Sequence, residues 1–92
     1  MKVKMNNFKV PVILRIDEER QGVMYIDERG MFNVNEIGVE ILLGLNENKS
    51  LESIYHELKV EYDIESKILK NDINEFIKQL VDLELINEKR WF

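Results

Sequence analysis

Few side chains in this sequence have the type and the spacing that chemistry would require. His56 is the single histidine, and the apolar residues around it predict that it lies on the polar side of a helix. The carboxylates at positions 17–19 and 27–28 fall in polar turns, where nothing would bury them for acid–base work. The chain has no cysteine, and no phosphate loop, serine-nucleophile motif or metal-ligand spacing occurs in it. We therefore expect a protein that is not an enzyme, holds no metal and no cofactor, and acts by binding.

Length and charge restrict what it can bind. With 92 residues the chain can build one modest core, and its net charge is -5. Scattered basic residues argue against nucleic acid, because phosphate binding gains its affinity from clustered lysine and arginine. The apolar runs are far shorter than the roughly 20 residues of a membrane span, and residues 1–7 lack the apolar stretch of a signal peptide. We expect a cytoplasmic protein, not associated with membranes, whose residues 1–7 are a flexible lead-in.

The first third of the chain has the periodicity of β-strands. Apolar residues occupy every second position from Phe8 to Ile16, and again at Val23 and Tyr25, which is the spacing of half-buried strands. Polar turns separate these runs, and Gly30 can supply a positive φ in the second turn. We predict strands at about residues 8–16, 23–26 and 31–34. They should form an antiparallel meander with the second strand in the middle.

The apolar spacing changes from the strand period to the helix period at residues 34–42. Asn35 is a favourable N-cap for a first helix, because its side-chain carbonyl can accept a free backbone N–H. This helix should end near Gly44. Gly38 within it costs about 1 kcal/mol relative to alanine. Either another backbone packs closely against that turn, or a glycine is tolerated near the start of the helix.

Two further helices are predicted. Ser50 is the expected N-cap of the second and Asp63 that of the third, which should run from about residue 64 to 85. At about 100° per residue, the third helix has a central apolar stripe of Leu69, Ile73, Phe76, Leu80 and Leu83. Ile77 and Val81 widen it on one side beyond the roughly 100° that one-sided packing requires. The surplus flank either lines a groove or packs against a second neighbour.

The two edges of the predicted sheet differ. Pro11 cannot donate a ladder hydrogen bond, so the first strand belongs at an edge. The third strand, residues 31–34, forms the other edge and contains no proline, lysine or internal charge that would blunt it. Such an edge can accept an added strand, unless the first helix or the C-terminal tail covers it.

A family resemblance emerges from the order and separation of several segments. Residues 25–34 combine a tight turn with a strand, and Asn35-Glu36-Ile37-Gly38 and Ile41-Leu42 follow. The pattern continues with residues 50–54, Leu58, Tyr62, Asp72, Phe76, Leu80 and residues 85–86. Over about residues 8–86 the chain resembles the PqqD family, the small domains known as RiPP precursor-peptide recognition elements. The resemblance implies an α+β, winged helix-turn-helix-like fold with a three-stranded antiparallel sheet followed by three helices.

The resemblance also implies a function and a site. Such domains bind the leader segment of a ribosomally synthesised precursor peptide as an added strand, laid along the third strand and against the third helix. The strand contacts would be Met31, Phe32, Asn33 and Val34, and the helix contacts Ile73, Asn74, Ile77, Lys78 and Val81.

A discrete domain of this kind would deliver the precursor to a separate maturation enzyme, such as a radical SAM protein or a leader peptidase with a cyclase. The length of the chain fits this discrete version. Residues 87–92 form a C-terminal tail beyond the resemblance. Trp91 and Phe92 in it should either fold back on the core or touch the enzyme.

Two other functions share this architecture. A winged helix-turn-helix protein can bind DNA with its third helix in the major groove. That helix and its ends carry an excess of acid, with Glu65, Asp72, Glu75, Asp82 and Glu84 against Lys67, Lys70 and Lys78. It has no arginine, the residue that most often reads guanine, so DNA binding is disfavoured. Another protein-interaction module would use the same surface and differ only in its ligand.

Overall fold

Strands precede helices along the chain, in an α+β arrangement of the predicted winged helix-turn-helix type. The computed structural model describes residues 1–87. Its elements are β1 (Lys2–Met5), β2 (Val12–Ile16), β3 (Gly22–Ile26), β4 (Gly30–Val34), α1 (Glu36–Asn46), α2 (Leu51–Glu61) and α3 (Ser66–Asp82). The sheet therefore has four strands where the sequence predicted three. None of the helices in residues 1–87 is long and apolar enough to cross a membrane.

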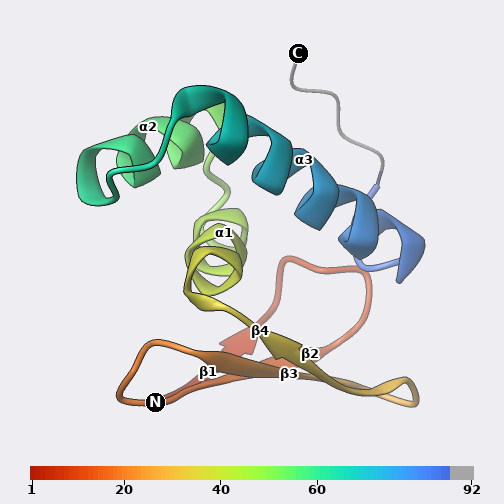
Figure 1. Ribbon diagram of the computed structural model, residues 1–92. Helices are drawn as coiled ribbons and strands as arrows, with labels where there is room; N and C mark the ends of the chain where they lie inside the picture. The colour runs from red at the N-terminus through yellow and green to blue at the C-terminus, as the bar shows by residue number, and fades with distance from the viewer. Residues whose placement is uncertain (88–92) are drawn as a thin grey trace.

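The elements are stacked in layers. Figure 1 shows the sheet as the lowest layer, α1 standing on it, and α2 and α3 lying across the far side of α1. The loop between β1 and β2 rises from the sheet to the C-terminal end of α3, where the Lys9 N–H donates to the Leu85 carbonyl at 2.8 Å. The core fills the space between the sheet and the helices, and the β1–β2 loop contacts the chain just beyond the carboxyl end of α3.

The amino-terminal residues are the main correction to the sequence prediction. Residues 1–7 do not form a flexible lead-in, because β1 pairs antiparallel with β2 from Lys2↔Arg15 to Met5↔Val12. Met5 is only 1% exposed. Its side chain and that of Val3 point to the core while the two lysines point outward, as the strand period requires. Four residues hold too few alternations to reveal a strand from sequence alone.

The strand before the first turn is shorter than predicted and lies inside the sheet. The sheet order is β1-β2-β3-β4, so β2 has a neighbour on each side and is not an edge. Pro11 precedes β2 and therefore removes no hydrogen bond from its ladder. Gly30 has the expected positive φ, 99°, and opens β4. The position of residues 31–34 at an edge is confirmed.

Two of the three helix caps are those that the sequence predicts. The side chain of Asn35 accepts from the Gly38 N–H at 2.8 Å, and that of Ser50 from the Ser53 N–H at 3.1 Å. The prediction for the third helix is wrong, because Glu65 occupies its N-cap and makes no side-chain cap hydrogen bond. Just before this helix, the Ile64 carbonyl accepts a hydrogen bond from Lys59 Nζ at 2.6 Å, which joins the start of α3 to the end of α2.

Polar contacts around the first turn of α1 tie three elements together. The Tyr62 hydroxyl, at the end of α2, donates to the Glu36 carboxylate. Arg20, in the turn before β3, pairs with both Glu36 and Glu40. Burial, reinforced by the hydrogen bond to Glu36, raises the pKa of Tyr62 to about 12. These contacts fix the start of α1 relative to both the sheet and α2.

The core role of β1 leads to the first prediction. Met5→Ala should lower the free energy of unfolding by about 2 kcal/mol or more, since it deletes a fully buried side chain. Lys4→Ala in the same strand is the matched control, and its exposed side chain should change stability by less than about 0.5 kcal/mol. Urea unfolding monitored by circular dichroism measures both. Equal, small effects would show that β1 does not contribute to the core.

Candidate functional site

The two edges of the sheet, β1 and β4, are not equivalent. β1 is four residues long and presents lysines to solvent, and both properties protect an edge from pairing. β4 contains no charged residue and pairs with β3 on one side only. Alternate residues of an antiparallel strand direct their N–H and C=O groups away from the partner. Within residues 1–87, β4 therefore offers unpaired backbone groups along its outer side, and the predicted tail contacts of Trp91 and Phe92 lie outside the described residues.

The side chains of β4 alternate between the two faces of the sheet. Met31, 67% exposed, points to the solvent face, away from the helices. Phe32 is half-buried on the helical face, and Val34 is buried there. Asn33 is exposed and lies at the end of the strand that borders the groove. An extended chain placed beside β4 would thus meet Phe32 on its inner side and Met31 on its outer side.

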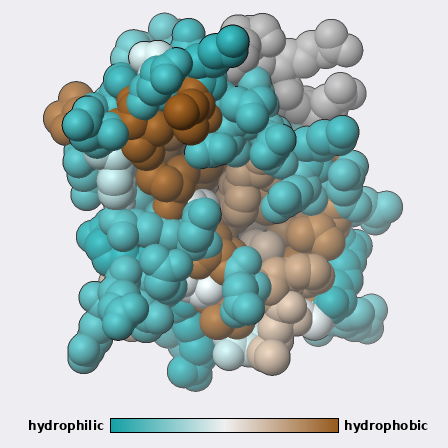
Figure 2. All heavy atoms as spheres, viewed as in Figure 1, coloured by the Kyte–Doolittle hydropathy of each residue, from teal (hydrophilic) through white to brown (hydrophobic). Residues whose placement is uncertain are grey.

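A groove begins where β4 passes into α1, and α3 forms its far wall. It encloses about 270 Å³. Its lining consists of Asn33, Asn35, Ile37, Gly38, Ile41, Asp72, Glu75, Phe76 and Gln79. On the face of the molecule drawn in Figure 2, apolar atoms show between the helical layer and the sheet, with hydrophilic atoms around them. The lining is mostly polar, with Ile37, Ile41 and Phe76 as its apolar side chains, so both polar and apolar side chains of a bound peptide would find contacts there.

α3 runs in the opposite direction to β4 and comes near it at two places. At one end, Arg29 in the turn before β4 donates to the Leu83 carbonyl beyond α3 and pairs with Glu84 at 3.5 Å. At the other end, the Phe76 ring reaches the junction of β4 and α1. The part of α3 that lines the groove reaches from Gln79 to Asp72. Phe76 lies near the carboxyl end of β4, and Asp72 lies one helical turn further on, past the end of the strand.

Gly38 makes this close approach possible. A Cβ atom at this position would lie 2.5 Å from Val34 Cγ1 and 3.0 Å from Phe76 Cε1. The packing inferred from a glycine inside a helix is therefore present, although the atoms that approach it belong to side chains and not to a backbone. The last residue of β4, the first turn of α1 and the middle of α3 meet at this point.

The structure separates the predicted helix contacts from the groove. Ile73 is fully buried and Ile77 is 4% exposed, so neither side chain is open to a groove. At about 100° per residue, Ile77 and Val81 lie on the opposite flank of α3 from Asp72 and Gln79. On that flank Lys70 lies over the Tyr55 ring of α2, 5.4 Å from its centroid. The surplus apolar flank faces a second neighbour, which is the alternative that the sequence left open.

Asn74 and Lys78 are exposed, and Val81 is half-buried, but none of the three lines the groove. Apart from Asn33, sequence reasoning assigned none of the residues that line the groove to the site; it missed Asn35, Ile37, Gly38, Ile41, Asp72, Glu75, Phe76 and Gln79. Phe76 was assigned to the central stripe of the helix, because spacing alone cannot show that the ring extends past the core. The signal available in the sequence was Gly38, because a glycine that lowers helix stability indicates that another group, here Phe76, packs closely against that turn.

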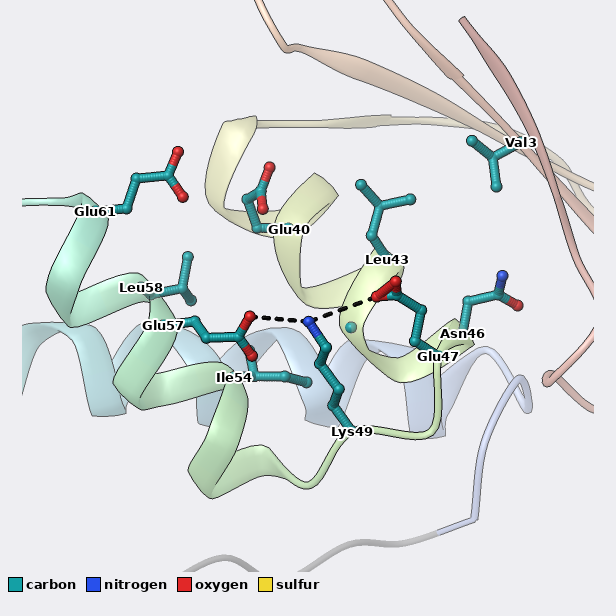
Figure 3. A pocket seen from close by; sticks show the side chains of 11 residues that line it. Val3, Glu40, Leu43, Asn46, Glu47, Lys49, Ile54, Glu57, Leu58 and Glu61 are labelled. Atoms are coloured by element: carbon teal, nitrogen blue, oxygen red, sulfur yellow. Dashed lines mark hydrogen bonds and ion pairs between the residues drawn. The ribbon is translucent and has the colours of Figure 1, made fainter.

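A second hollow lies between α1 and α2, and most of its charged side chains form ion pairs. Figure 3 shows Lys49 between two carboxylates, Glu57 at 2.8 Å and Glu47 at 3.5 Å. The hydrogen bond with Glu57 raises the pKa of Lys49. A further carboxylate of the same hollow, Glu40, pairs with Arg20. These contacts join the helices and leave little for a ligand, and residues 1–87 contain no cluster of metal-ligating side chains.

The fold and the open edge define a small winged helix-turn-helix-like domain, and sequence comparison gives its family. Residues 21–86 match the family described as "Coenzyme PQQ synthesis protein D (PqqD)", and the chain belongs to this family. Its members are non-catalytic, peptide-binding domains. No curated protein matches the sequence significantly.

A solved structure supports the fold. The chain is similar to the protein described as "TbiB1 in Complex with the TbiA(beta) Leader Peptide", with a TM-score of 0.72 and 22% sequence identity. The match covers 87% of this chain and 93% of that chain. The α+β, winged helix-turn-helix-like prediction is confirmed, with β1 as an addition to it.

The packing at Gly38 leads to the second prediction. Gly38→Ala should lower the free energy of unfolding by about 1 kcal/mol, because overpacking against Val34 and Phe76 exceeds the roughly 1 kcal/mol that alanine gains in a helix. Thermal and urea denaturation measure the sign. In a Val34→Ala background the closest clash is removed, so the same substitution should then be neutral or stabilising. Stabilisation by Gly38→Ala in the parent chain would show that α3 does not pack against this turn.

Proposed function

We propose that this chain binds the leader segment of a ribosomally synthesised precursor peptide and presents the precursor to a separate maturation enzyme. The observation that carries the proposal is the open edge of β4 beside a groove whose far wall is α3. Membership of the PqqD family supports it. The fold similarity to TbiB1, which is described in complex with a leader peptide, supports it as well. The enzyme would be a radical SAM protein or a leader peptidase acting with a cyclase.

The leader would add to the sheet as a fifth strand. Backbone hydrogen bonds to β4 would hold any extended peptide, and the side chains on its inner face would select the sequence. Met31, Phe32, Asn33 and Val34 are the proposed strand contacts. For the helix we propose Phe76, which lines the groove, ahead of Ile73 and Ile77, whose side chains are buried. Contacts through Asn74, Lys78 and Val81 stay predictions.

The role of the α3 wall leads to the third prediction. Phe76→Ala should weaken leader binding about tenfold or more, because an apolar contact of an aromatic side chain is worth about 1.5–3 kcal/mol. Calorimetry with synthetic leader segments from short reading frames beside the gene measures the affinity. Val60→Ala is the matched control, since Val60 is an apolar residue of α2 that is 89% exposed and does not line the groove. Ile37→Ala, in α1, should weaken binding in the same direction as Phe76→Ala.

Circular dichroism must show that each variant is folded. A folded Phe76→Ala chain that binds as tightly as the Val60→Ala control would place the peptide elsewhere. Ile77→Glu is unsuitable for this test, because a carboxylate at a position that is 4% exposed would disrupt the core.

Strand addition can be tested separately from side-chain selection. N-methylation of single peptide residues removes one backbone donor at a time. Because alternate residues of an added strand face β4, affinity should fall at every second position and change little at the positions between. A uniform loss along the peptide, or none, would exclude pairing with β4. A peptide of unrelated origin that gave the alternating pattern would favour the other protein-interaction module.

Binding of DNA is the competing function, and the structure changes one argument about it. α3 is shorter than predicted, and within Ser66–Asp82 three acids balance three lysines. The acidic excess lies in the flanking residues Glu65 and Glu84. The remaining arguments are the absence of arginine from α3 and the net charge of -5.

The fourth prediction is therefore that the protein does not bind duplex DNA. Fluorescence anisotropy with a mixed-sequence duplex at low salt should show no binding at micromolar protein, since no clustered cations would release counterions. Micromolar affinity that falls steeply with added salt would support the DNA-binding alternative.

A further inference from the structure

The charges of α3 are segregated around its axis. At about 100° per residue, Asp72 lies roughly 40° and Gln79 roughly 60° from Phe76. The three lysines of the helix, Lys67, Lys70 and Lys78, lie about 120° or more from Phe76 by the same geometry. By the same geometry Glu75 lies about 100° and Asp82 about 120° from Phe76, on the same flank as Asp72. The acids of α3 are thus gathered on the flank that includes Asp72, and the lysines lie away from it.

The groove itself carries charge of one sign. Asp72 and Glu75 are its only ionisable lining residues, and its other polar liners are the neutral Asn33, Asn35 and Gln79. Neither carboxylate has an ion pair or hydrogen bond within residues 1–87, whereas Glu36, Glu40 and Glu57 elsewhere on the helices are paired. The N-terminus of α1, which opens on the same groove, is already capped by the Asn35 side chain. The groove therefore favours a cation.

The position of the acids relative to the strand gives a spacing. Phe76 stands beside the end of β4, and Asp72 lies one helical turn further along, beyond that end. One turn of helix rises about 5.4 Å, and two residues of an extended strand span about 6.6–6.8 Å. A strand that lies along β4 and continues past its end would place one side chain against Phe76 and the next side chain of the same face near Asp72.

We propose that the peptide bound in this groove carries a lysine or arginine two positions from the apolar residue that contacts Phe76, and that Asp72 and Glu75 select it. This inference rests on the proposed function and adds the chemistry of the ligand. Apolar anchoring supplies affinity, and the acidic rim excludes segments with a carboxylate at the same position.

A randomised library of twelve-residue peptides, displayed on their own mRNA and selected on the full chain, tests the proposal without knowledge of the natural precursor. Selected peptides should share an apolar residue with lysine or arginine two positions away. They should bind the Asp72→Lys, Glu75→Lys double variant about tenfold more weakly at low salt, and the difference should shrink as salt is added.

The matched control is the Asp63→Lys, Asp82→Lys double variant. It changes the net charge by the same amount at two exposed positions that do not line the groove. Its affinities should stay within about twofold of the parent chain. Replacement of the basic residue of the peptide by glutamate should reverse the preference between the parent chain and the groove variant.

The outcomes separate this inference from the proposed function. Peptides that show the alternating N-methylation pattern but no shared basic residue, or that bind the groove variant and the parent equally, would overturn the inference and leave strand addition intact. Selected peptides without the alternating pattern, or a selection that yields no binding peptide, would overturn both. An equal loss of affinity in the groove variant and in the control variant would also overturn the inference, because net charge alone would then explain it.

Discussion

The contact of Gly38 with Val34 and Phe76 is the constraint on which the site depends. Because position 38 lacks a side chain, the middle of α3 can approach the turn that joins β4 to α1. The same turn is fixed by the Asn35 cap and by the paired carboxylate of Glu36. A larger residue at position 38 would separate the helix from the strand and open the groove on its apolar side. This one close contact therefore positions α3, on one side of the groove, relative to the end of β4 and the start of α1 on the other side.

The two edge strands of the sheet, β1 and β4, differ in how open they are to pairing with a further strand. β1 covers β2 and closes the core over Met5, and its lysines and short length discourage pairing on its own free side. β4 has no such protection, and it runs beside α3 between the Arg29–Leu83 contact and Gly38. A free strand edge beside a groove invites pairing with another chain and aggregation. The peptide proposed above would occupy this edge.

The chemistry available to the domain is that of recognition. Within residues 1–87, Glu40 and Glu57 form ion pairs with Arg20 and Lys49. No cluster of side chains in this part of the chain could hold a metal ion. The two unpaired acids of the groove lie near Phe76 and the end of β4, the edge strand within residues 1–87 that lacks protecting charges. Backbone pairing, an apolar contact and a charge preference can thus act on one peptide segment, each contributing separately to affinity and to selectivity.

Sequence alone determined most of the secondary structure of this protein. The change from strand to helix period at residues 34–42, the caps Asn35 and Ser50, the positive φ of Gly30 and the edge position of residues 31–34 are all confirmed. The caps, the turn and the change of period depend on interactions between residues close in the chain, which leave a pattern in the sequence. The edge position follows from consecutive strands joined by short turns, which pair in order. The family resemblance likewise used order and separation, and the match over residues 21–86 confirms it.

Tertiary structure decided the remaining features. Residues 2–5 become a strand only because β2 and the core accept Met5, and so short a segment has no periodicity of its own. The flank of α3 that faces the groove could not be chosen from spacing, because the apolar arc is wide enough to be buried from two directions. Ile77 is enclosed while Phe76 reaches the groove, since α2 packs against one side of α3 and Gly38 admits the ring on the other. Which side of a helix stays open is a property of its neighbours, and the neighbours are brought together only by the fold.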